Sequence, residues 1–241
     1  CVSTAAYLSI HNMVTWMIDS HGSESIKEKF INRLSTMEIM SSYCLTEAGS
    51  GSDAAAMKTS ALRKGNSHYV LNGSKSFISG GPTSDVFAVM CRTGEDGANG
   101  VSCVLIEKET KGLSFGKQEK KMGWNSQHTS MVNFDNCQIP LENIVGNEGD
   151  GFKIAMKGLD GGRVNIAACS LGGARAALEA SISYSAERKQ FGKSIDQFQV
   201  IQFKLADMAT ELEASRLMVL RAASSLDAKD PEATKLCAMA K

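Results

Sequence analysis

The first residues that could do chemistry form a Gly- and Ser-rich loop, Gly49-Ser-Gly-Ser-Asp-Ala54. Its spacing fits the loose GxGxxG/A pattern, in which a tight turn directs a phosphate onto the N-terminus of a helix. That pattern requires a parallel sheet, with a strand before the loop and a helix after it. The residues that follow favour short antiparallel strands instead, so we do not interpret the loop as a Rossmann-type site. Taken alone, such a loop is most often a turn.

Two charged clusters lie in segments with helical periodicity. Asp160 and Arg163 stand three residues apart, a spacing that ordinarily gives a weak surface ion pair. Arg188 precedes Lys189, and the guanidinium fork of an arginine can donate two parallel hydrogen bonds to phosphate oxygens. Without further context the first cluster is a surface ion pair and the second is a solvated helix end.

Composition excludes several classes of site and partner. The seven Cys are odd in number and never spaced as CxxC, and there are only four His, which favours reduced thiols over a disulfide framework or a metal site. The 26 Lys and Arg balance the 26 Asp and Glu, so the charge favours neither nucleic acid nor an anionic membrane as a partner. No apolar run approaches the roughly 18 residues of a membrane span. The chain opens on Cys1 inside an apolar pattern, so we expect a fragment, with any targeting peptide upstream.

The elements that must position these residues change along the chain. Residues 2–18 are apolar on all sides, as in a buried helix, and Ser23 can cap a second helix with Ile26 on its apolar face. After about residue 40, short apolar runs alternate with turn residues, which predicts an antiparallel barrel or sandwich. Asn72-Gly73 lies between two of these runs and predicts the type I′ turn of a hairpin.

The last part of the sequence is helical again. A segment from Gly151 to about Glu187 keeps helical periodicity despite five internal glycines, which indicate either a close approach of backbone or ligand, or a kinked helix. A further helix begins near Asp196 with an apolar stripe, and another begins at Pro231. The sequence therefore predicts an α+β protein of three parts, namely residues 1–39, 40–147 and 148–241.

A longer string gives the Gly-rich loop a more specific context. Tyr43-Cys-Leu-Thr-Glu-Ala-Gly-Ser-Gly-Ser-Asp53 resembles the first signature of the acyl-CoA dehydrogenase family. Further blocks that resemble this family follow in the family's order: Gly73–Ser79, Gly123–Ser126, Asp160–Arg163 and Arg188–Gly192. The resemblance extends along the whole chain, and so many blocks in order exclude chance.

This resemblance implies a fold and a reaction. The family fold has an N-terminal helical domain, a middle antiparallel β-barrel or sandwich domain and a C-terminal four-helix bundle, assembled as a tetramer. Of that bundle, the chain would hold only the first helices. The family binds FAD and oxidises an acyl-CoA thioester to the 2-enoyl-CoA. The resemblance further implies electron-transfer flavoprotein as the electron acceptor and the mitochondrial matrix as the compartment.

The resemblance also implies roles for individual residues of the β domain. FAD contacts are expected from Tyr43, Cys44, Leu45, Thr46, Ser52, Phe77, Ile78 and Ser79. Ser52 is also expected to contact the CoA portion of the substrate. Many relatives have Trp and Thr where this chain has Phe77 and Ser79. Phe can stack on a ring but lacks the indole N–H, whereas Ser keeps the hydroxyl.

In the helical part, the resemblance implies two further groups. Substrate contacts are expected from Asp160, Gly161, Gly162 and Arg163. Contacts to the FAD pyrophosphate and adenine bound by a neighbouring subunit are expected from Arg188, Gln190 and Phe191, with further FAD contacts from Phe198 and Gln199.

The catalytic base of the family is a Glu that occupies one of two positions. One position lies beyond Lys241, and the other, immediately before Arg163, is Gly162 in this chain. Glu47 and Glu148 are the other candidate carboxylates, but the first belongs to the flavin-strand motif and the second to the loop that enters the helical bundle. We therefore expect neither a catalytic residue nor a metal ligand among these 241 residues.

Three strings favour the members of the family that act on short branched acyl-CoAs: residues 72–80, 119–127 and 161–172. Their resemblance to those members implies oxidation of isobutyryl-CoA to methacrylyl-CoA, a step of valine catabolism. Three alternatives stay open on the same fold. They are a short or 2-methyl-branched-chain dehydrogenase, an oxidase or monooxygenase that passes electrons to oxygen, and a non-catalytic fragment.

Overall fold

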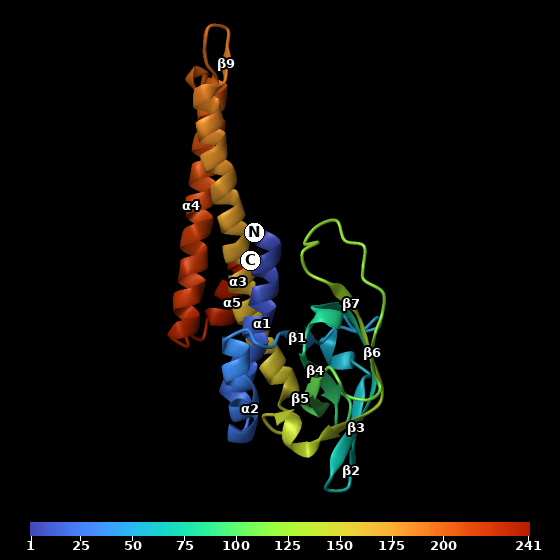
Figure 1. Cartoon of the computed structure of the whole chain (residues 1–241). Helices are drawn as coiled ribbons and strands as arrows, with labels where there is room; N and C mark the ends of the chain where they lie inside the picture. Colours follow the sequence, from blue (N-terminus) through green and yellow to red (C-terminus); the bar gives the residue numbers. More distant parts are fainter. The chain divides into compact units, whose positions relative to one another are not determined.

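A computed structural model describes all 241 residues (Figure 1). The chain divides into two compact units. One unit comprises Tyr7–Leu159, and the other comprises Cys1–Ala6 together with Asp160–Lys241. The long helix α3 (Gly151–Glu187) contributes to both units. The three-part division drawn from the sequence stays a prediction.

Two helices precede the sheet of the first unit. α1 (Val2–His21) and α2 (Glu24–Ser35) are separated by a short turn, and the Ser23 hydroxyl caps α2 by accepting the Ile26 N–H. Buried His11 of α1 accepts the Ser41 N–H at Nδ1, so its Nε2–H donates to the Leu34 carbonyl. This histidine therefore ties α1 to the end of α2 and to the first strand.

A mostly antiparallel sheet follows between Ser41 and Val145. Its strands are β1 (Ser41–Cys44), β2 (Ser60–Lys64), β3 (His68–Ser79), β4 (Val86–Arg92), β5 (Val101–Glu107), β6 (Leu113–Phe115), β7 (Thr129–Pro140) and β8 (Ile144–Val145). The order is β6-β7-β3-β2-β4-β5-β8, with β1 beside β4. The pairs that β4 makes with β1 and β2 are parallel, and the others are antiparallel. The parallel β1–β4 ladder needs no helical crossover because β2 and β3 make the connection.

The turn predicted at Asn72-Gly73 is wrong. β3 runs unbroken through both residues, and its pairing with β7 shifts register between Leu71 and Gly73. Gly73 has a φ of 142°, and a Cβ there would lie 2.7 Å from the Thr59 Cα. The glycine thus permits an irregularity in the strand and the close approach of a second backbone. The turn between β2 and β3 falls instead at residues 65–67.

The hydrophobic core lies on both faces of the central strands. Val86, Ala88 and Met90 of β4 pack in one cluster with α1, α2 and the start of α3. The alternate residues of the same strand, Phe87 and Val89 among them, pack in a second cluster with β3 and β7. β4 and β5 are buried on both faces, which explains why nearly all their residues are apolar, although β5 also buries Ser102.

The second unit is helical. The part of α3 that belongs to it lies beside α4 (Gln199–Asp227), and the two are joined by a small hairpin of β9 (Lys189–Gln190) and β10 (Lys193–Ser194) (Figure 1). A short helix, α5 (Ala233–Ala240), packs on α4 through a core of Ala222, Leu236 and Cys237. None of the helices combines the length and the apolar character of a membrane span.

The glycines of α3 do not break the helix. α3 is continuous over 37 residues, and a Cβ at Gly158 would lie 2.3 Å from the Met17 side chain of α1. The sequence allowed either a close approach of backbone or ligand, or a kinked helix. At Gly158 the structure shows a close approach, but the neighbouring group is a side chain. Short 3₁₀ helices occupy Ala54–Ala56, Gly81–Thr83, Ala98–Gly100, Leu141–Asn143 and Ile195–Gln197.

Candidate functional site

The residues that follow β1 are no longer part of the sheet, but β3 still hydrogen-bonds them. The Ser76 N–H donates to the Thr46 carbonyl at 2.8 Å, and Lys75 Nζ donates to the Leu45 carbonyl at 2.9 Å. The structure thereby brings together two predicted site segments, 43–46 and 77–79.

The side chains of these two segments lie in different environments. Cys44 and Ile78 are buried in the hydrophobic core, so only their backbone could meet a ligand. Phe77 is 65% exposed and has a φ of 59°, a costly backbone conformation for a bulky residue. The Tyr43 hydroxyl is buried without a hydrogen-bond partner, and burial raises the pKa of Tyr43. Thr46 is half-buried, and its hydroxyl makes no hydrogen bond to the protein.

Ser79 is positioned by a chain of hydroxyl groups. The Ser42 hydroxyl donates to the Ser79 carbonyl at 2.6 Å and lies 2.7 Å from the Ser84 hydroxyl. Ser84 in turn hydrogen-bonds the Tyr7 hydroxyl at 2.7 Å. A Cβ at Gly80, whose φ is 83°, would lie about 2.5 Å from these hydroxyls, so this packing requires glycine.

The Gly-rich loop closes on itself. Glu47 and Ser50 exchange backbone hydrogen bonds, and the Ser50 hydroxyl donates to the Asp53 carbonyl at 2.6 Å. Ser52 is exposed at its tip. Only a three-residue 3₁₀ helix follows, so the loop does not precede the α-helix that a Rossmann-type phosphate site requires.

Glu47 is held by three donors. Its carboxylate accepts the Lys58 N–H at 2.8 Å, the Thr59 N–H at 2.9 Å and Lys75 Nζ at 2.9 Å. Desolvation opposes its charge, but the hydrogen bonds from Thr59, Lys58 and Lys75 prevail and lower the pKa of Glu47 to about 2. A carboxylate held in this way is a weak proton acceptor.

Glu148 is also engaged. It accepts a hydrogen bond from the Tyr69 hydroxyl and lies 3.6 Å from Arg63 Nη1. Burial and then the Glu148 carboxylate raise the pKa of Tyr69 to about 12. Both candidate carboxylates are therefore parts of the β domain's own polar network.

Asp160 differs from the exposed residue that its spacing suggests. It is only 8% exposed, forms an ion pair with Arg163 and accepts the Thr234 hydroxyl at 2.7 Å. The pair therefore links α3 to α5. Gly161 faces open space, and Gly162 is half-buried.

The remaining predicted residues gather at the hairpin end of the second unit. Arg188, Gln190 and Gln199 are exposed there, and Phe191 is 94% exposed with a φ of 54°. The Phe191 and Phe198 rings meet edge to face at 6.2 Å. This end thus offers a guanidinium, amides and an uncovered aromatic ring, a combination suited to phosphates and a planar base.

Comparison with known families assigns the chain. The model of the acyl-CoA dehydrogenase middle domain matches residues 42–137, and the model of the acyl-CoA dehydrogenase C-terminal domain matches residues 149–241. The chain belongs to the acyl-CoA dehydrogenase family. The resemblance inferred from the motifs is confirmed, and so is the predicted fold, with helical parts before and after a largely antiparallel sheet in the sequence.

Individual relatives agree with this family. Mitochondrial isobutyryl-CoA dehydrogenase of Bos taurus is 56% identical over the whole chain, which spans 58% of that relative's length. The structure of butyryl-CoA dehydrogenase from Megasphaera elsdenii matches with a TM-score of 0.93 at 39% identity, covering 99% of this chain and 62% of the other. A structure of PigA with FAD and proline matches with a TM-score of 0.93 at 32% identity, covering 98% and 61%.

The motifs gave no role to Lys75, although its side chain holds the predicted flavin segment by donating to the Leu45 carbonyl. Lys75 lies inside the family block 73–79, and its side chain is fully buried. The only signal was a lysine within a strand whose neighbours are apolar or small. Its partner Glu47 lies 28 residues away, so pattern alone could not join them.

Proposed function

We propose that this chain is part of an FAD-dependent acyl-CoA dehydrogenase that oxidises isobutyryl-CoA to methacrylyl-CoA, a step of valine catabolism. The observation that carries the proposal is 56% identity to a mitochondrial isobutyryl-CoA dehydrogenase over all 241 residues. The chain spans 58% of that relative, so the activity is that of the intact protein. By the same likeness, the intact protein works in the mitochondrial matrix as a homotetramer and passes electrons to electron-transfer flavoprotein.

The residues of the β domain fit the isoalloxazine end of FAD. The Thr46 hydroxyl has no protein partner, the Tyr43 hydroxyl is an orphaned buried group, and the exposed Phe77 ring offers an apolar surface for a planar ring. Thr46 would hold the pyrimidine edge, and Phe77 and Ser79 would flank the ring. The backbone of Cys44, Leu45 and Ile78 would complete this wall, with Ser52 at the CoA side. When bound, FAD accepts the hydride that leaves the substrate's β carbon.

The residues of the helical part fit the other end of the cofactor and the substrate. Arg188, with Gln190 and Phe191, would hold the pyrophosphate and adenine of an FAD bound to a neighbouring subunit, and Phe198 and Gln199 would add contacts. The α3 segment with Asp160, Gly161, Gly162 and Arg163 would contact the acyl-CoA. Because Thr234 and Arg163 engage the Asp160 carboxylate, Asp160 would act mainly by orienting Arg163.

Arg188→Ala in the intact enzyme should weaken FAD retention by about tenfold or more, because one charge-assisted fork to a pyrophosphate is lost. Lys189→Ala is the matched control, since Lys189 is the exposed neighbour on the same hairpin. Flavin release on dilution, followed by fluorescence, measures the difference. If the Arg188→Ala variant holds flavin as tightly as the wild type, Arg188 does not contact FAD.

A further inference from the structure

The least expected charge of the β domain is Lys75. Its side chain is 0% exposed, although it lies in β3, the strand that also carries the predicted flavin residues Phe77–Ser79. Burial lowers the pKa of Lys75, and hydrogen bonding and charge from Glu47 act in the opposite direction. A buried ammonium is costly unless it is paired and hydrogen-bonded, so its contacts carry information.

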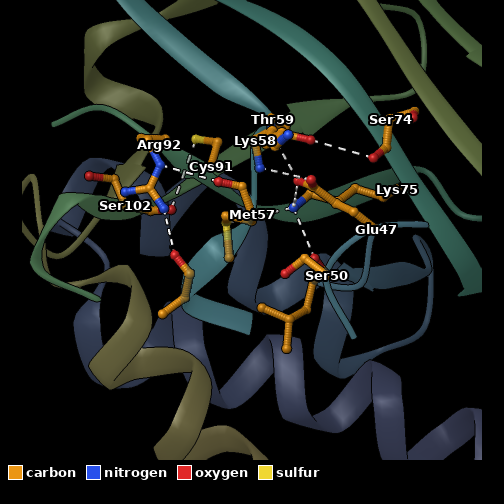
Figure 2. Close-up of polar contacts among 12 residues, drawn as sticks. Glu47, Ser50, Met57, Lys58, Thr59, Ser74, Lys75, Cys91, Arg92 and Ser102 are labelled. Carbon is orange, nitrogen blue, oxygen red and sulfur yellow. Dashed lines mark hydrogen bonds and ion pairs between the residues drawn. The ribbon is translucent and has the colours of Figure 1, made fainter. Parts of the chain in front are cut away.

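Lys75 Nζ has three neighbours. It donates to the Leu45 carbonyl at 2.9 Å and to Glu47 Oε1 at 2.9 Å, and it lies 3.7 Å from Met57 Sδ. The nearby thiols of Cys44 and Cys91 do not neutralise the Lys75 charge. Burial raises the pKa of both thiols to about 12 and keeps them uncharged. Glu47 is therefore the counter-ion. Figure 2 shows the Glu47 and Lys75 side chains pointing toward one another.

Glu47 is itself fixed in place. Besides Lys75, its two carboxylate oxygens accept the N–H groups of Lys58 and Thr59, which precede β2. Three successive residues of the chain, Leu45 to Glu47, are thus anchored, the first and third by Lys75 and the second by the Ser76 N–H. Stability alone does not require this arrangement, because a well-packed apolar pair usually replaces a buried ion pair without loss.

The hydrogen bond to Leu45 acts on the next residue. The Leu45 carbonyl and the Thr46 N–H belong to one peptide unit, which is planar and trans, so they point in opposite directions. The Thr46 N–H therefore points away from Lys75, and it has no protein acceptor. A cation on the carbonyl side also polarises the peptide and makes its N–H a stronger donor.

We propose that the buried Lys75–Glu47 pair is a positioning device for the flavin site, which fixes the Leu45–Thr46 peptide and strengthens the Thr46 N–H as a donor to the cofactor's pyrimidine edge. This inference rests on the proposed function. It makes Lys75 a positioning residue, which acts on the cofactor through a peptide and does not touch it. Its effect is largest on the reduced cofactor, whose added negative charge the donor would stabilise.

The test uses the intact, FAD-reconstituted protein with the double substitution Lys75→Met/Glu47→Gln, which removes both charges at nearly constant volume. FAD affinity should fall by about tenfold, because the Thr46 N–H is no longer held toward the cofactor and its hydrogen bond to FAD is lost. The flavin reduction potential should become more negative. In the apoprotein, amide hydrogen exchange of residues 45–47 should be faster than in the wild type, which reports the positioning without any cofactor.

Arg92→Met is the matched control, because Arg92 anchors the adjacent loop. It donates to the Ala55 carbonyl at 2.6 Å and to the Met57 carbonyl at 3.2 Å (Figure 2). It should lower the unfolding temperature but leave FAD affinity and potential unchanged. A double variant with wild-type affinity and potential overturns the proposal, as does equal loss in the Arg92 variant. If the double variant does not fold, Lys75→Gln/Glu47→Gln, which keeps hydrogen bonding within the pair, takes the same test. A wild type that binds no FAD refutes the proposed function instead, and the exchange measurement then still decides whether Lys75 positions the segment.

Discussion

The 241-residue chain, purified and supplied with FAD, should form no enoyl-CoA from isobutyryl-CoA. Removing the α proton needs a carboxylate within hydrogen-bond reach of that carbon, and geometry comes before pKa. The position before Arg163, which some members of the family use for the base, is Gly162 and has no side chain. Chromatography of the acyl-CoA products after long incubation measures the result. More methacrylyl-CoA than FAD forms in the absence of the protein would contradict the prediction.

The structure strengthens this expectation for the two other carboxylates. Glu47 is bound by three donors, and its pKa of about 2 makes it a poor proton acceptor. Glu148 is engaged by Tyr69 and Arg63. If product appeared, Glu47→Gln and Glu148→Gln would be the first variants to test.

A gain of function in the intact enzyme completes this prediction. With the enzyme's own base replaced by Ala, Gly162→Glu should restore a small part of the rate, because it puts a carboxylate at the family's second base position on α3. Gly161→Glu is the matched control, since Gly161 is adjacent on the helix and faces open space. Equal recovery in both variants, or none in either, would show that Gly162 does not mark a base position.

Glu47→Gln in the intact protein should lower the free energy of unfolding by about 3–5 kcal/mol, because it leaves the Lys75 ammonium buried without a counter-ion. The double substitution Lys75→Met/Glu47→Gln should recover most of that loss, since it leaves no unpaired charge. Denaturant unfolding of the wild type, the two single variants and the double variant forms a double-mutant cycle. A single variant within about 0.5 kcal/mol of the wild type would contradict the buried ion pair.

The same pair predicts an acid-sensitive term in stability. The pKa of Glu47 is about 2 in the folded protein, against 4.5 ordinarily. Its contribution is therefore fully present above pH 4.5 and is lost as the pH falls toward 2. The difference between the two pKa values corresponds to a stability contribution of up to about 3 kcal/mol. Solvent screening of the partly exposed carboxylate reduces this contribution. The Glu47→Gln variant should lack this part of the pH dependence.

Local signals predicted most of the secondary structure. Ser23 caps α2 as expected, α3 ends at Glu187, and the strands fall on the apolar runs. The error at Asn72-Gly73 has a tertiary cause. The dipeptide favours a turn by itself, but β2 and β7 pair on either side of it, and the glycine is needed where Thr59 approaches. The parallel pairing of β1 with β4 could not be predicted from local sequence, because the two strands lie far apart in the chain.

The candidate site divides in the same way. Motifs identified the segments 43–46 and 77–79, which are continuous in sequence. They did not reveal that Cys44 and Ile78 face the core, or that Lys75 holds the first segment. Such roles depend on partners 28 or more residues away, which only the folded chain brings together.

Anaerobic addition of isobutyryl-CoA to the intact, FAD-containing enzyme tests the central claim most directly. The yellow flavin absorption should bleach with formation of methacrylyl-CoA, recover slowly in air and recover quickly with electron-transfer flavoprotein. The kcat/KM for isobutyryl-CoA should exceed those for butyryl-CoA and 2-methylbutyryl-CoA. A preference of about tenfold for either competitor would move the protein to a sister subgroup. Rapid recovery in air would make it an oxidase, and a flavin that no acyl-CoA bleaches would contradict the assignment as a dehydrogenase.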